Sequence, residues 1–448
     1  MVKIKLSTEQ KKFFSLLLAV APPVALQEVL SASVNMVDTL MIGRAMGVSQ
    51  VAAVGLANQI TFLYMLMVFG IISASGVFSG QYFGKGDIIS IHKIMGIGFL
   101  GTGFTAALFF VGGFFFAPQI ISIYSQDSYV IEMSANFLQI ISISYCISFI
   151  TVTRNAAMRS MRKTTFPMIT TAIALLTNVG LNFLAIFIFD FGLTGVAIST
   201  VASRLIELIA QEILIRKHKI PIITSIRKYF DFDITFLKHF LKIGLFIIFN
   251  EIFWAVGVSM YNIAYGIVGT EAQGAIQISV TMMMLFQVFG NSLAISTGII
   301  VSNTLGEQKR ELAIKYAKLS IRTGIAICVA TGLVLAAFSP LLAGFYNVTP
   351  QVASDIVNIL LIGSATMIFR VANFIMIVGI LRSGGDTKWC FWVETGTVYL
   401  IGVPFAFLGA SLGLPVYLVF SMAMLEEIVK SILVLKRVLS LKWAVTIV

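Results

Sequence analysis

Four polar side chains follow one face of the first apolar segment of the chain. Glu28, Ser31, Asn35 and Asp38 stand at offsets 0, 3, 7 and 10, which places them on one stripe of an α-helix. A carboxylate in the middle of a bilayer costs about 2.5–3.5 kcal/mol on insertion scales. The stripe must therefore face water or the inside of a helix bundle, where Asp38 could bind a cation. The alternative is that Asp38 caps or ties helices, or lies near the outer end of its helix.

Partners for Asp38 occur in two later apolar segments. Asn178 and Asn182 are four residues apart, on one helical face, and Thr200 stands inside "GVAISTVAS". One carboxylate, two amide oxygens and a hydroxyl are hard oxygen donors with a single negative charge, which suits a small monovalent cation. The alternative for the asparagines is hydrogen bonding between helices, worth about 0.6 kcal/mol each.

A second stripe lies in the segment "NEIFWAVGVSMYNIAY", residues 250–265. Glu251, Trp254, Tyr261 and Tyr265 stand at offsets 0, 3, 10 and 14. Aromatic faces beside a carboxylate can hold an organic cation through charge and cation–π contact. We expect these four residues, together with Asn35 and Glu28, to bind substrate. The alternative for Glu251 is a buried ion pair, with Arg370 as its candidate partner.

Three other acids, Glu394, Glu426 and Glu427, also lie in apolar surroundings, and Lys430 stands three residues beyond Glu427. They form either structural ion pairs near the cytoplasmic side or a functional cluster.

Motifs of soluble catalysts are absent from the sequence. It has no phosphate-binding GxxxxGK[ST] loop, and its three histidines and three cysteines do not stand at metal-ligand spacing. There is also no His/Asp cluster or Ser–Lys dyad for an intramembrane enzyme. We therefore expect no enzyme activity and no cofactor other than a coupling ion.

The elements that position these residues are long apolar segments. The 448 residues are 58% hydrophobic and 11% charged, with a mean hydropathy of +0.96, whereas soluble domains are about 45–50% apolar and about 25% charged. A membrane span needs about 20 apolar residues. Twelve such spans are predicted, over about residues 13–40, 52–76, 93–117, 129–153, 165–189, 192–214, 240–265, 273–299, 313–338, 353–380, 388–409 and 413–435.

Basic residues are concentrated in alternate loops, which marks the cytoplasmic side. They include Lys11, Arg159 and Arg382, the stretch 216–228 and Lys436, whereas Arg44 is the exception in the opposite loops. We therefore expect a multi-pass protein of the cytoplasmic membrane with both termini inside. The net charge of +11 then reflects this asymmetry and the anionic inner leaflet, not a nucleic-acid partner.

The chain resembles itself at a separation of about 222 residues. "SASGVFSGQYFGKGD" (73–87) lies over "ISTGIIVSNTLGEQK" (295–309), and "AMRSMRKTT" (157–165) lies over "ILRSGGDTK" (380–388). Each half holds six spans, so both halves share one orientation, as in transporters whose parallel repeats are related by an axis along the membrane normal. The predicted fold is all-α, with two six-helix bundles: an N-lobe over 1–215, a cytoplasmic linker over 216–236 and a C-lobe over 237–448.

Several motifs resemble those of the multidrug and toxic compound extrusion (MATE) transporters. They are "VDTLMIGRAMG", "AAVGLANQI", "GQYFGKGD", "TNVGLNFLAIF", "GLTGVAISTVAS" and "GILRSGGDTKW", in this order across almost the whole chain. The resemblance implies twelve-helix antiporters that export organic cations or amphiphilic drugs, driven by Na⁺ or H⁺. It also implies an N-lobe cation site at Asp38, Asn178, Asn182 and Thr200.

The same resemblance implies a functional glutamate at Glu251. The aspartate that another branch of the family has in the tenth helix is replaced here by Val371, which puts a C-lobe cation site in doubt. A lipid-linked-precursor flippase of related fold is the alternative function, and it would need a basic cavity. Neither the substrate, the choice between Na⁺ and H⁺, nor the conformational state follows from the sequence, and we expect a monomer.

Overall fold

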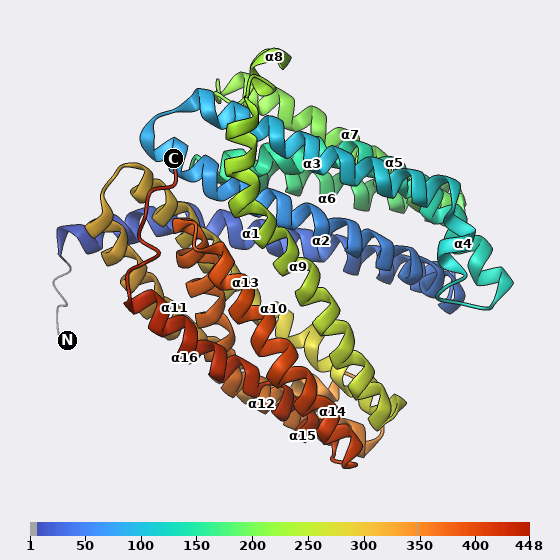
Figure 1. Ribbon diagram of the computed structural model, residues 1–448. Coiled ribbons are helices and arrows are strands. Elements are labelled where there is room, and N and C mark those ends of the chain that lie inside the picture. The colour runs from blue at the N-terminus through green and yellow to red at the C-terminus, as the bar shows by residue number, and fades with distance from the viewer. Residues whose placement is uncertain (1–6, 347) are drawn as a thin grey trace. The chain divides into compact units, whose positions relative to one another are not determined.

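The computed structural model describes residues 7–346 and 348–448, apart from the side chains of Asn35 and Val48. Over those residues the chain consists of helices joined by short turns and loops, without strands (Figure 1). Eleven of these helices are long and apolar enough to cross a membrane. The expectation of an all-α polytopic protein is therefore confirmed.

The first half of the chain forms six long helices. The elements are α1 (Thr8–Ala45), α2 (Val48–Lys85), α3 (Ile88–Phe115), α4 (Ala117–Ile121), α5 (Ser128–Ser160), α6 (Thr165–Phe183), a π-helical turn η1 (Leu184–Ile188) and α7 (Gly192–Lys217). Each of the first six predicted spans falls on one of these helices, or on α6 with η1 for 165–189, and none extends more than two residues beyond its helix. A π-helical turn is rare and is frequent at functional sites, and η1 begins two residues after Asn182.

The second half is less regular. Its elements are α8 (Ile226–Tyr229), α9 (Ile234–Val268), α10 (Thr270–Gly306), α11 (Arg310–Gly344), α12 (Pro350–Phe374), η2 (Ile375–Leu381), η3 (Arg382–Gly384), α13 (Thr387–Thr397), η4 (Val398–Gly402), α14 (Val403–Ser411), α15 (Val416–Ala423) and α16 (Leu425–Leu439). The twelfth predicted span, 413–435, falls on α15 and α16. These two helices meet at Met424, whose N–H donates to the carbonyl of Phe420, so the span is made of two short pieces.

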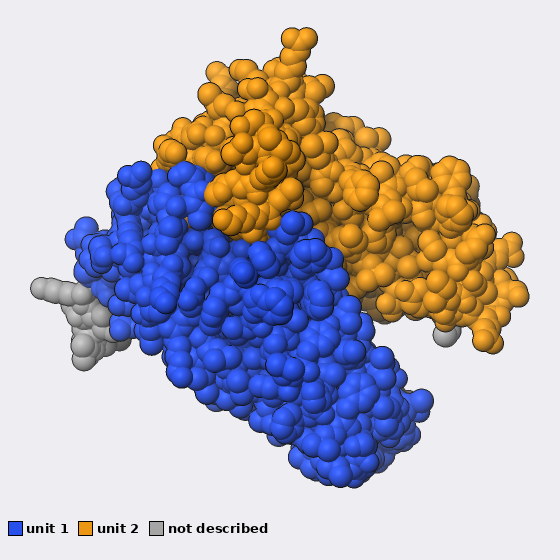
Figure 2. Space-filling view, viewed as in Figure 1, with its two compact units in different colours: residues 1–25, 245–448 blue, residues 26–244 orange. Residues whose placement is uncertain are grey.

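By packing, the chain divides into two compact units (Figure 2). The N unit is residues 26–244, and the C unit is residues 245–448 together with residues 1–25. Both boundaries fall inside continuous helices, α1 and α9. The lobes 1–215 and 237–448 are defined by the sequence repeat, whereas the units are defined by packing, so the two divisions describe different properties.

Side-chain contacts explain why the starts of α1 and α9 belong to these units. In the C unit, Phe13 is buried against Tyr316, with ring centroids 5.4 Å apart. In the N unit, Phe240 packs against Phe78 at 5.3 Å. Pro22 and Pro23, just before the boundary in α1, lack the N–H groups that would bond to the preceding turn, yet the helix is continuous through them.

The predicted linker packs on the N unit. His92 on α3 contacts the carbonyl of Pro221 at 2.9 Å, and the hydroxyl of Tyr229 donates to the carbonyl of Ile222. Gly96 lies so close to the backbone of Tyr229 that a Cβ there would collide with it. The loop is therefore anchored, while Ser225 within it is exposed.

Candidate functional site

The N unit brings Asp38, Asn178 and Asn182 together. The Nδ2 of Asn182 donates to Oδ1 of Asp38 at 2.6 Å and to Oδ1 of Asn178 at 3.3 Å. Both asparagines are fully buried, and Asp38 is half-buried. The spacing of the asparagines by one helical turn on α6 places both amides against α1, as the sequence predicts.

Two polar atoms of this cluster have no partner among the described residues, and both are buried: Oδ1 of Asn182 and Nδ2 of Asn178. Buried polar groups are nearly always hydrogen-bonded, so such an orphan requires an explanation. Two oxygens, from Asp38 and Asn178, already converge on one partly positive nitrogen, and a third oxygen beside them is free. This donor set fits a small hard cation bound by oxygen ligands.

Thr200 lies on α7 and is not seen bonded to Asp38 in the part of the chain described. Its hydroxyl donates to the carbonyl of Val196 at 3.1 Å, which leaves the oxygen lone pairs available as an acceptor. Three of the four expected cation ligands, Asp38, Asn178 and Asn182, are therefore connected by hydrogen bonds. Thr200 has no such bond to them among the described residues.

Arg204, one turn beyond Thr200, is a neighbour that the sequence did not assign to this site. It acts electrostatically on Asp38 and forms an ion pair of 2.9 Å with Glu207, which is buried. The two carboxylates thus share one guanidinium, and the cluster of Asp38, Arg204 and Glu207 carries one excess negative charge. The sequence feature that could have identified Arg204 is an arginine within a predicted span, three residues before a glutamate.

The other members of the first stripe lie elsewhere. Glu28 is more than a third exposed and pairs with Arg159 at 3.4 Å. Arg159 also donates to Gln27, and Gln27 donates to Thr171 at 3.1 Å. The predicted substrate contact of Asn35 lies outside the described side chains.

In the C unit, Glu251 forms a buried ion pair with Arg382. Arg382 Nη1 donates to Glu251 Oε1 at 2.8 Å, and Nη2 lies 3.6 Å from Oε2 of Glu394. The pair that the sequence left open is therefore present, but its partner is Arg382 in place of Arg370. Arg370 lies instead 4.0 Å from Glu427.

Arg382 lies at the predicted turn after the tenth span, but it is not a hydrated loop residue, because its side chain is only 2% exposed. The short helix η3 and the left-handed Gly385 turn the chain sharply after it. Gly384 has no Cβ, which lets the backbone of Trp443 from the C-terminal segment lie directly over this turn. The loop is thus covered, and the guanidinium extends toward the two acids.

The same hydrogen bonds occur in both halves of the chain. Arg159 and Arg382 each bond to a glutamate 131 residues earlier, and Gln27 and Asn250 each donate to a side chain 144 residues later. One common offset along the chain relates the four equivalent pairs, which are Glu28 and Glu251, Arg159 and Arg382, Gln27 and Asn250, and Thr171 and Glu394. The halves therefore share a polar clamp, which is more buried in the C unit.

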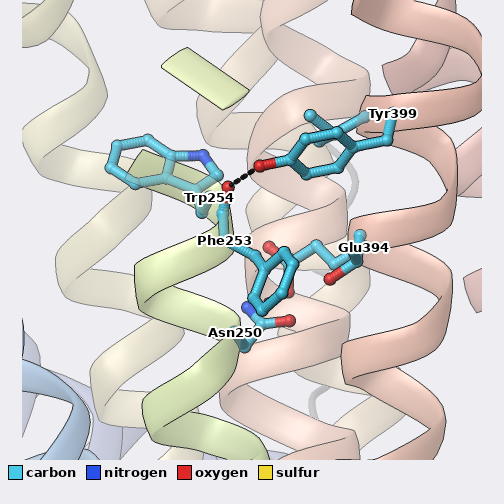
Figure 3. Close-up of a pocket in the computed structure, with 7 residues that line it drawn as sticks. Asn250, Phe253, Trp254, Glu394 and Tyr399 are labelled. Carbon is cyan, nitrogen blue, oxygen red and sulfur yellow. Dashed lines mark hydrogen bonds between the residues drawn. The ribbon is translucent and has the colours of Figure 1, made fainter. Parts of the chain in front are cut away.

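A small pocket lies beside this clamp in the C unit (Figure 3). It is a shallow hollow lined by Asn250, Phe253, Trp254, Glu394, Thr395, Val398 and Tyr399. Tyr399 donates its hydroxyl to the carbonyl of Phe253 at 2.9 Å, and Asn250 donates to Glu394 at 2.7 Å (Figure 3). Of the predicted aromatic stripe, Trp254 lines the pocket. The carboxylate in the pocket lining is Glu394, not the predicted Glu251.

Tyr261 and Tyr265 are buried further along α9, away from that lining. The acids Glu426 and Glu427 lie close to Lys430 at 3.6 and 3.5 Å. Asn373 donates to Glu427 at 2.7 Å. The three acids that the sequence left open thus belong to a buried network of charges.

Comparisons with known proteins agree with this architecture. A family model, MatE, matches residues 23–184 and 247–408, one match in each half of the chain. The chain is 25% identical over 412 residues to "Uncharacterized transporter YisQ" of Bacillus subtilis (strain 168), covering 91% of this chain and 90% of that protein. It is also 25% identical over 402 residues to "Probable multidrug resistance protein YoeA" of the same organism, covering 86% and 84%.

Among solved structures, the fold is similar to that of a multidrug resistance MATE family transporter of the MOP superfamily in an outward-facing conformation. The TM-score is 0.85, with 16% identity, and 95% of this chain and 96% of that chain are covered. That likeness shows the twelve-helix, two-bundle fold, and the family model matches well over half of the chain. The protein is therefore a transporter of the MATE family, a multi-pass membrane protein and not an enzyme.

Proposed function

We propose that this protein is a cation-coupled antiporter that exports organic cations or amphiphilic drugs by alternating access. The coupling ion, Na⁺ or H⁺, binds at Asp38 with Asn178, Asn182 and Thr200. The observation that carries this proposal is the convergence of the Asp38 and Asn178 oxygens on one nitrogen of Asn182, with the Asn182 oxygen buried and unpartnered. A relative named as a multidrug resistance protein supports the substrate class.

The charge around Asp38 supports a single coupling cation. Arg204 balances only one of the two acids, Asp38 and Glu207, and an uncompensated buried charge is costly. One bound monovalent cation would neutralise the cluster. Antiport follows if ion and substrate favour opposite conformations, because a ligand that binds both states equally shifts nothing.

The substrate side of the proposal rests on the pocket of the C unit. Trp254 and Tyr399 offer aromatic faces, and Glu394 offers a carboxylate, the combination that binds organic cations. Drug-sized ligands occupy about 300–1,000 Å³, whereas the hollow beside Glu394 has no room for one in this conformation. These residues would therefore contact substrate in another conformation, with Glu251, bound to Arg382, holding the wall of the site in place.

A lipid-linked-precursor flippase is less well supported. Such a protein needs free cationic groups to bind pyrophosphate. In the C unit both Arg382 and Lys430 lie between two carboxylates. Their positive charges are therefore already balanced by these acids and are not free to bind a phosphate.

We further propose that the protein acts as a monomer in the cytoplasmic membrane, with both termini and the segment 216–236 inside. The Lys/Arg asymmetry of the loops supports this orientation. Lipid, substrate and the coupling ion are the partners that this proposal implies.

The test is efflux from reconstituted vesicles, first under a Na⁺ gradient at fixed pH and then under a pH gradient without Na⁺. Asp38→Asn keeps the shape of the side chain and removes its charge, so we expect normal insertion and at least tenfold slower coupled export. Asp190→Asn, which changes an exposed acid of the same unit, is the control and should behave as wild type. Full activity of Asp38→Asn under either gradient would remove Asp38 from the mechanism.

A further inference from the structure

The buried charges of the C unit do not balance. Four acids and three bases interact in one network: Glu251, Glu394, Glu426 and Glu427 with Arg370, Arg382 and Lys430. Glu394 joins the two ends, because it pairs with Arg382 and also acts electrostatically on Glu426 and Lys430. One carboxylate is therefore in excess, in a network whose side chains are at most 16% exposed apart from Arg370 at 34%.

The hydrogen bonds show which carboxylate is least stabilised. Glu251 accepts from Arg382 at 2.8 Å, Glu394 accepts from Asn250, and Glu427 accepts from Asn373. Glu426 is 4% exposed, its Oε2 has no hydrogen-bond partner among the described residues, and its nearest cation, Lys430 Nζ, is 3.6 Å away. Of the four acids, Glu426 thus has the weakest contacts with donors, which favours proton uptake there.

The hydroxyl of Tyr261 lies at the same place. Tyr261 is 9% exposed, and its hydroxyl is also buried without a hydrogen-bond partner in the described chain. A Cβ added at Gly402 would meet both this hydroxyl and the Cγ of Glu426, so the two side chains adjoin. The tyrosine hydroxyl can donate to Glu426 in either protonation state and can also accept from the neutral acid, so this contact accommodates a proton on Glu426.

The sequence repeat provides a second line of evidence on the region around Glu426 and Tyr261. At the offset that relates the two polar clamps, Tyr261 corresponds to Asp38, and Glu427 and Lys430 correspond to Arg204 and Glu207. The C unit thus has an ion pair at the position of the N-unit pair, with its charges reversed, and a tyrosine in place of the cation-binding aspartate. Its acid comes instead from α16, one residue after the helix begins following the break at Met424.

We propose that Glu426 is a proton-binding site of the C unit, and that it releases its proton when a cationic substrate occupies the pocket beside Glu394. This rests on the proposed function for the nature of the substrate. Either positive charge, the proton or the substrate, balances the same excess carboxylate, so each weakens the binding of the other.

The charged and titratable groups that face Glu426 set this exchange. They are Glu427 and Lys430 on α16, Arg370 on α12, Glu394 on α13, and Tyr261 and Tyr265 on α9. Protonation adds one proton to a carboxylate oxygen of Glu426 and changes no other bond. On release, the proton returns to water.

Infrared spectroscopy in an Asp38→Asn background tests the site, since that background removes the other candidate carboxylic acid. We expect a carbonyl band of a buried protonated acid near neutral pH, its loss in Glu426→Gln and its retention in Glu28→Gln, the repeat equivalent of Glu251. Tyr261→Phe should shift the band without abolishing it. A band of equal size in Glu426→Gln, or no band before that change, overturns the proposal.

Proton release tests the exchange. Tetraphenylphosphonium is a cation without a titratable proton, and its binding to Asp38→Asn protein in weakly buffered detergent should release about one proton per cation. Glu426→Gln should bind it and release none. Equal release from both proteins, or binding without release from the first, refutes the exchange. Loss of ion-driven export in Asp38→Asn tests the proposed function separately and does not affect this result.

Discussion

Replacing Glu251 by glutamine separates a structural role from a role in substrate binding. The substitution removes one carboxylate from Arg382, which is 2% exposed and whose other acid, Glu394, is 3.6 Å away. Breaking a buried ion pair by removing one partner costs about 3–5 kcal/mol. Because Glu394 remains, we expect the lower end of that range, a loss of about 3 kcal/mol in the free energy of unfolding.

The other half of the chain supplies a matched control. Glu28 pairs with Arg159 at 3.4 Å, and these side chains are 37% and 21% exposed. Ion pairs accessible to water contribute about 0–1 kcal/mol. Glu28→Gln should therefore destabilise the protein by less than about 1 kcal/mol, although it removes the equivalent interaction of the repeat.

The assay is reversible unfolding by SDS in mixed micelles, followed in parallel with dye efflux from vesicles. The double variant Glu251→Gln/Arg382→Gln should be no more stable than Glu251→Gln, because removing the guanidinium leaves Glu394, 3.6 Å from it, without its cation. If Glu251→Gln loses efflux while its unfolding free energy equals that of wild type, Glu251 binds substrate and the clamp interpretation is wrong.

Two further predictions concern topology and the pocket. Ser225→Cys in a Cys146→Ala background should react with an impermeant thiol reagent only in inside-out vesicles, since Ser225 is exposed and Cys146 is the exposed native thiol; labelling of intact cells would reverse the orientation. Trp254→Ala should weaken the binding of a fluorescent organic cation about five- to thirtyfold, the range expected for a loss of about 1–2 kcal/mol of cation–π contact, whereas Trp392→Ala, outside the pocket lining, should leave it unchanged.

The length of the apolar stretches predicted most of the fold. Each predicted span lies on a helix or on a series of adjoining helices, because every apolar stretch long enough to cross the bilayer must satisfy its own backbone hydrogen bonds. The last span differs from the prediction of one continuous helix, because its helix is interrupted at Met424. Nothing in the composition of 413–435 marks that residue, so the break depends on the surrounding packing.

The candidate sites were only partly accessible to sequence reasoning. Helical spacing brought Asn178 and Asn182 to one face, and contact with Asp38 followed. Spacing along α9 could not show that Trp254 and Glu251 diverge, one to the pocket and the other to Arg382. Counting basic residues in loops treats each as hydrated, and Arg382 escaped that rule because the C-terminal segment covers its turn.

The two proposed cation sites, one in each unit, predict the charge that moves during transport. If one cation enters at Asp38 and one proton at Glu426 while one monovalent organic cation leaves, each cycle carries one net positive charge inward. A membrane potential supplies about 2.3 kcal/mol per charge for every 100 mV, which corresponds to about a 50-fold steeper substrate gradient. An inside-negative potential, imposed with potassium and valinomycin on vesicles, should therefore stimulate export by wild type. Glu426→Gln should export at a rate independent of the potential, and Glu28→Gln should respond as wild type. Equal stimulation of Glu426→Gln and wild type would show that the proton on Glu426 stays in place throughout the cycle.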